Sequence, residues 1–150
     1  MIFLIFLSFP ILVFAQKILV DKKTKQVTVD GVFQFIIEKV DCGLFDADCH
    51  FDVMDNTNNK MIRISFKDFY TPAEMSSSNP KGRVTYLEYI FLESKLKAEI
   101  DAPINLKPEK IAAYIVKNKL LINGTLHMKA IDEFVLIHGT AFSERARRNR

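Results

Sequence analysis

Residues 61–67 read Met-Ile-Arg-Ile-Ser-Phe-Lys, with apolar and polar side chains in alternation. Ile62, Ile64 and Phe66 point to one side of an extended segment, so the stretch predicts a strand with one buried and one wet face. Residues 55–60 before it are Asp-Asn-Thr-Asn-Asn-Lys, which favours a turn because Asn and Asp tolerate left-handed backbone conformations. Residues 51–54 are again mostly apolar, and we therefore expect an antiparallel hairpin.

Further strand patterns lie on both sides of this hairpin, separated by polar turns. The expected strands cover residues 18–20, 26–30, 32–37, 51–54, 61–66, 84–92 and 96–100. Residues 70–83 hold Pro72, Pro80 and Gly82 and form the longest loop signal of the chain. About seven consecutive strands joined in this way predict an antiparallel β-meander.

The hydrophobic period changes to that of a helix after Asn105. Pro108 suits the first turn of a helix, and an apolar stripe follows it over residues 111–120. We expect Asn123-Gly124 to end this first helix, and a second helix to run from Thr125 or Leu126 to Gly139. The predicted fold class is therefore α+β, with the meander followed by a C-terminal pair of short amphipathic helices.

The first fifteen residues contain no charged side chain and are too few to cross a bilayer as a helix. They are typical of a secretory signal peptide, with Val13 and Ala15 as the small residues before a cleavage that leaves Gln16 first. A buried strand and a membrane anchor are the alternatives. We expect a signal peptide over 1–15, a single α+β domain over 16–142 and a basic disordered tail over 143–150. The mature protein would then be exported, to the periplasm or outside the cell, with no transmembrane span.

The net charge of +3 is concentrated at the C-terminus. Residues 143–150 hold four arginines and one glutamate, so the rest of the chain is formally neutral. Such a tail is usually solvated, although it could also bind an acidic partner. Because the excess is local and export is expected, the sequence argues against nucleic acid as a partner.

Cys42 and Cys49 are the only cysteines and lie close together in the sequence. In an oxidising compartment they could form a disulfide that contributes about 2–3 kcal/mol to stability. Two free buried thiols are the alternative. A zinc site would require further ligands at matching spacing, and the sequence does not supply them.

Residues 41–55 contain five aspartates and no Lys or Arg. Oxygen-rich loops are what calcium prefers, so Asp46, Asp48 and Asp52 are the candidate metal ligands. The stretch lacks the order of ligands that an EF-hand requires. We therefore prefer an acidic loop closed by the disulfide, with no cofactor.

No motif for nucleophilic catalysis or phosphate binding occurs in the chain. The sequence favours an exported noncatalytic binding or structural domain with a protein, peptide or glycan partner. One alternative is an envelope-associated accessory protein that docks through its sheet edge or Arg-rich tail. Another is an enzyme or calcium-binding protein that uses the acidic segment with His50. Phe69, Tyr70, Tyr86 and Tyr89 could line a binding surface. Tyr86 and Tyr89 fall on opposite faces of one strand, so at least one could be exposed, but we prefer cross-strand packing as the role of these aromatic residues.

Overall fold

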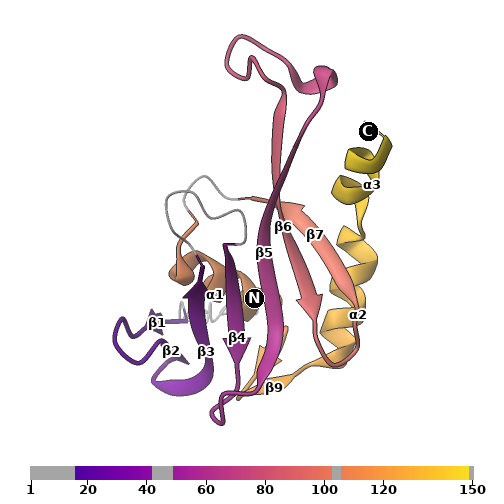
Figure 1. Cartoon of the computed structure of the whole chain (residues 1–150). Helices are drawn as coiled ribbons and strands as arrows, with labels where there is room; N and C mark the ends of the chain where they lie inside the picture. The colour runs from indigo at the N-terminus through magenta and orange to yellow at the C-terminus, as the bar shows by residue number, and fades with distance from the viewer. Residues whose placement is uncertain (1–15, 42–48, 103–105, 149–150) are drawn as a thin grey trace, which may run out of the picture.

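The computed structural model describes residues 16–41, 49–102 and 106–148. Seven strands form one antiparallel sheet whose spatial order follows the chain, so the predicted meander is confirmed (Figure 1). The strands are β1 (Ile18–Val20), β2 (Gln26–Val29), β3 (Val32–Val40), β4 (His50–Met54), β5 (Lys60–Tyr70), β6 (Arg83–Phe91) and β7 (Lys97–Asp101).

The hydrophobic core lies on one face of this sheet, because side chains alternate between the faces along each strand. Register places Phe51 opposite Ile64, and Ile62 opposite Phe91, so all four aromatic and branched side chains share that face. Helix α1 (Pro108–Lys117) contacts β1 and β3 on it, and helix α2 (Met128–His138) lies along β7. The α+β class is therefore confirmed, with the helices after the meander (Figure 1).

The segment between α1 and α2 differs from the expected helix-ending turn. Strands β8 (Leu121–Ile122) and β9 (Thr125–Leu126) form a small separate hairpin around Asn123-Gly124. Both turn residues have positive φ, 48° at Asn123 and 78° at Gly124, which is the conformation of a two-residue hairpin turn. The prediction was wrong because Asn-Gly suits both a helix end and this turn, and the α1 helix already ends at Lys117.

The C-terminal residues also differ from the expected disordered tail. Ala141–Arg148 form helix α3, directly after the Gly139 cap of α2. Phe142 stacks on Tyr86 at a centroid distance of 5.1 Å, and Arg145 donates to the Glu74 carboxylate at 2.6 Å. These partners are distant in the sequence, so charge pattern alone could not reveal the helix.

Strands β5 and β6 form the longest hairpin and extend beyond their neighbours (Figure 1). The expected loop at its end contains the 3-10 helix η1 (Pro72–Glu74) and is closed by the Thr71 N–H, which donates to the Gly82 carbonyl at 2.9 Å. Gly82 has φ +62°, and a Cβ there would lie 2.0 Å from the Thr71 oxygen. Only glycine fits this closure without moving the backbone.

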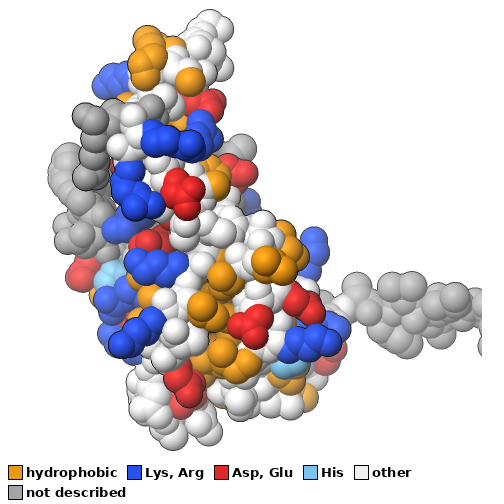
Figure 2. Space-filling model, turned by 90° about the vertical axis from the view of Figure 1, so that its right-hand side faces the viewer, with side chains coloured by type: hydrophobic (Ala, Val, Ile, Leu, Met, Phe, Trp, Pro, Cys, Tyr) orange, Lys and Arg blue, Asp and Glu red, His pale blue; other side chains and the backbone are white. Residues whose placement is uncertain are grey.

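Figure 2 looks onto the side of the molecule where α2 and α3 lie, and hydrophobic side chains gather in the middle of that face. Leu136 and Ile137 of α2 are 86% and 75% exposed. None of the helices in the described ranges has the length and apolar character needed to span a bilayer.

Candidate functional site

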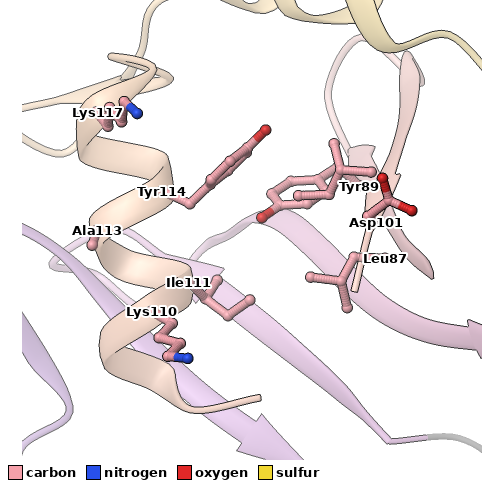
Figure 3. A pocket seen from close by; sticks show the side chains of 9 residues that line it. Leu87, Tyr89, Asp101, Lys110, Ile111, Ala113, Tyr114 and Lys117 are labelled. Atoms are coloured by element: carbon pink, nitrogen blue, oxygen red, sulfur yellow. The ribbon is translucent and has the colours of Figure 1, made fainter. Parts of the chain in front are cut away.

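An apolar cavity of about 360 Å³ lies between α1 and strands β6 and β7 (Figure 3). Its size falls within the range of small-molecule sites. The sheet and the helix both contribute to the wall, and three charged side chains stand at its rim. The lining residues are Leu87, Tyr89, Ile100, Asp101, Lys110, Ile111, Ala113, Tyr114 and Lys117.

Strand and helix periods together bring these side chains to one place. Leu87 and Tyr89 share the core face of β6, and Ile100 of β7 is the register partner of Leu87. Ile111 and Tyr114 are three residues apart on α1 and therefore lie on neighbouring parts of its surface. The cavity is thus an unfilled part of the layer between helix and sheet.

The Tyr89 hydroxyl is the most unusual group in this cavity wall. The side chain is fully buried, and its oxygen has no hydrogen-bond partner among the described residues. Burial raises the pKa of Tyr89 far above its ordinary value, with a smaller contribution from Tyr114, so the hydroxyl stays protonated and can donate. An unpaired buried hydroxyl costs about 1–3 kcal/mol, which a ligand with an acceptor would recover.

Aromatic neighbours hold the Tyr89 ring in place. Its centroid lies 5.5 Å from that of Phe134 and 6.2 Å from that of Tyr114. Figure 3 shows Tyr89 reaching from the sheet towards α1 beside Tyr114. The hydroxyl is therefore fixed before any ligand arrives, which lowers the entropic cost of binding.

A second cavity of about 360 Å³ adjoins the first at the edge of β7. Its lining is Glu99, Ile100, Asp101, Tyr114, Ile137, His138 and Phe142, so Ile100, Asp101 and Tyr114 belong to both cavities. Glu99 is 2% exposed; its Oε2 accepts from the Ser143 N–H at 3.0 Å, and its Oε1 has no partner in the described structure. The Tyr114 hydroxyl lies 3.4 Å from His138 Nε2.

Of the three predicted metal ligands, the structure describes one. Asp46 and Asp48 lie outside the described residues, whereas Asp52 is buried on β4 between two cations. Lys60 Nζ lies 2.5 Å and Arg63 Nε 3.1 Å from its carboxylate oxygens. Burial opposes ionisation, but hydrogen bonds from Arg63 and Lys60 outweigh it and lower the pKa of Asp52. The protein's own side chains thus balance this charge.

No group of three His, Cys, Asp or Glu side chains is arranged for a metal ion in the described ranges. His50 Nε2 lies 3.7 Å from Asp52 Oδ2, so His50 is close to one of the predicted metal ligands. Cys42 lies outside the described residues, and Cys49 directly precedes β4. The Cys42–Cys49 disulfide, like the signal peptide over residues 1–15, stays a prediction.

The alternative of an exposed aromatic binding surface is not formed by these residues. Tyr86 and Tyr89 do lie on opposite faces of β6, but both are buried, at 7% and 0% exposure. The preferred interpretation, cross-strand packing, is confirmed, because Phe69 of β5 lies edge-on against the Tyr86 ring of β6. Phe142 of α3 covers the same ring. Tyr70 alone is exposed.

Sequence reasoning named Tyr89 but missed Tyr114 and Glu99. Tyr114 stands beside the apolar stripe of α1, and this position was the available signal. Nothing in the local pattern marks Glu99, since it alternates with apolar neighbours as an exposed strand residue would. No family model, no curated protein and no solved structure matches the chain.

Proposed function

We propose that this protein is an exported, noncatalytic binding domain that holds a small apolar molecule between α1 and strands β6 and β7. The observation that carries the proposal is Tyr89, which lines the cavity and whose buried, protonated hydroxyl has no partner in the described structure. The ligand has an apolar body that fills the cavity and an oxygen or nitrogen that accepts from Tyr89. Export rests on the apolar first fifteen residues.

The chemistry of the cavity wall supports binding in preference to catalysis. Apolar and aromatic side chains dominate it, and the described lining contains no Ser, Thr or Cys that a base could activate. The charged Asp101, Lys110 and Lys117 are exposed and stand at the rim. A mostly apolar cavity with one fixed polar group is typical of a ligand site.

The binding test uses 1-hexanol as a neutral probe and calorimetry as the measurement. We expect wild-type protein to bind it and Ala113→Leu, which fills the cavity from α1, to lose binding while remaining folded. Tyr89→Phe should bind about fivefold more weakly, because one hydrogen bond contributes about 1 kcal/mol.

If Tyr89 had only a structural role, Tyr89→Phe would lower the melting temperature and would leave binding of 1-hexanol unchanged. Removing an unpaired buried hydroxyl leaves the free protein at least as stable as before, so Tyr89→Phe should not lower the melting temperature. Tyr70→Phe is the matched control, since Tyr70 is exposed and far from the cavity lining. Equal binding by wild type and Ala113→Leu would contradict the proposed function.

A further inference from the structure

We propose that the second cavity, at the edge of β7, binds an organic ammonium group, and that the ligand is therefore an amphiphilic amine. This inference rests on the proposed function, because it places the charged end of the same ligand. It assigns the apolar body to the cavity beneath α1 and the ammonium group to the cavity lined by Glu99.

Glu99 is the group that points to a cation. A buried carboxylate is costly unless hydrogen bonds or an opposite charge compensate it. Glu99 is 2% exposed and receives one described hydrogen bond, from the Ser143 N–H to Oε2 at 3.0 Å. Its Oε1 is buried and has no partner within the described ranges, so one acceptor in this wall is left for a ligand.

The other residues that line this cavity also favour a cation. Asp101 adds a second carboxylate, and the described lining includes no Lys or Arg. Its one basic side chain is His138, whose Nε2 lies 3.4 Å from the Tyr114 hydroxyl. Tyr114 and Phe142 add aromatic rings, which attract ammonium groups through their faces. Carboxylates and aromatic rings together favour an ammonium ion over an anion or a neutral polar group.

The charges also orient the ligand. Lys110 and Lys117 stand at the rim of the cavity beneath α1 and disfavour an ammonium group there. Ile100, Asp101 and Tyr114 line both cavities, so the two cavities share a wall and one ligand that lies over these side chains would reach both. The ammonium end therefore goes to Glu99, and the alkyl chain lies against the apolar wall. The acceptor for Tyr89 is a separate polar atom on that chain, because an ammonium group can only donate.

The experiment compares n-hexylammonium, 1-hexanol and hexanoate by calorimetry at one ionic strength. We expect n-hexylammonium to bind at least tenfold more tightly than 1-hexanol, and hexanoate more weakly than either, because charge-assisted hydrogen bonds are the stronger class. Glu99→Gln keeps an acceptor for the Ser143 N–H and should remove the preference for the ammonium ion. Glu88→Gln is the matched control, since Glu88 is the register partner of Glu99 and pairs with Lys97.

The outcomes separate the two proposals. If 1-hexanol binds to the wild type but n-hexylammonium binds no more tightly, the ammonium assignment is wrong and the proposed function stands. If no probe binds to the wild type, both are wrong. A preference that survives in Glu99→Gln would overturn the assignment of the ammonium group to Glu99, and Asp101→Asn would then show whether Asp101 alone attracts the amine.

Discussion

Asp52 is a buried carboxylate whose charge is balanced by two side chains from β5. Its side chain is 1% exposed, whereas Lys60 and Arg63 are 49% and 39% exposed. The two cations are partly redundant, because either one can still neutralise the carboxylate when the other is lost. Removing both would leave only His50, whose Nε2 lies 3.7 Å from Asp52 Oδ2, beside the buried charge, and this is far more costly than losing an exposed pair.

We predict strong non-additivity between Lys60 and Arg63. Lys60→Met and Arg63→Met should each lower the free energy of unfolding by about 1 kcal/mol, and the double variant by about 3–5 kcal/mol. Urea unfolding provides the measurement, and Asp52→Asn in the double variant should restore part of the loss. Lys97→Met, which breaks the exposed pair with Glu88, is the control. Additive single effects would show that the two cations stabilise Asp52 independently, which would contradict the predicted redundancy.

Asp55 at the β4–β5 turn is half-buried and strongly hydrogen-bonded. Its carboxylate accepts from the Thr57 hydroxyl at 2.7 Å and from the Asn59 N–H at 3.0 Å. These bonds, with that from Thr57 first, lower the pKa of Asp55 to about 2. A lowered pKa in the folded state means that the stabilisation is present above about pH 4 and is lost as the pH falls towards 2.

Thr57→Val should therefore raise the pKa of Asp55 towards the ordinary value of 3.8. An NMR titration of the Asp55 carboxyl carbon measures this directly. The titration in Thr24→Val serves as the control, because Thr24 binds Asp21 in a different turn. An unchanged midpoint in Thr57→Val would show that the hydroxyl is not the main cause.

At the scale of elements, α3 depends on the sheet more than on its own sequence. It has eight residues, none of them buried, and isolated helices of that length are marginal in water. Phe142 on Tyr86, the Ser143 N–H on Glu99 and Arg145 near Glu74 and Phe69 join it to the long hairpin and β7. Loss of the aromatic contact should release the helix.

We predict that Phe142→Ala frees α3 while the meander stays folded. Hydrogen exchange should become fast for residues 141–148, with the core strands still protected, because stacked aromatic pairs contribute about 0.5–1.5 kcal/mol beyond their buried area. Arg147→Ala changes the charge of α3 and leaves its aromatic contact intact, which makes it the control. Unchanged exchange in Phe142→Ala would show that other contacts hold the helix.

At the scale of the whole molecule, β7 is the relevant edge of the sheet. The Glu99 N–H donates to the Gly139 carbonyl at 2.9 Å, and α2 lies along β7, so this edge is already partly occupied. Docking of a partner through the sheet edge, one alternative from the sequence, therefore has less support there than at β1. Part of the Arg-rich segment is likewise already engaged, because Arg145 forms an ion pair with Glu74.

The proposed export is tested on protein purified from its native host. We predict an intact mass that lacks residues 1–15, with both cysteines protected from alkylation until a reductant is added. A full-length mass with two reactive thiols would contradict both the signal peptide and the Cys42–Cys49 disulfide. Protein made with and without residues 1–15 gives the reference masses.

Much of the fold follows from local pattern. The alternation at residues 61–67 matches β5, and the expected strands on both sides match the order of the sheet, because adjacent antiparallel strands need only short turns. The start of α1 at Pro108 was also predicted, since a proline suits the first helical turn. Asn123-Gly124 was not assigned correctly because the same dipeptide suits two turns.

The candidate site could not be predicted in this way. Tyr89 and Ile111 each have an ordinary local pattern, and only the packing of α1 over β6 and β7 leaves a cavity between them. Glu99 resembles an exposed strand residue until the α2–α3 junction covers it. The amino-acid pattern determines strand order and helix faces because these depend on near neighbours. Which polar groups become buried without partners depends on contacts between distant segments, and the tertiary structure alone decides them.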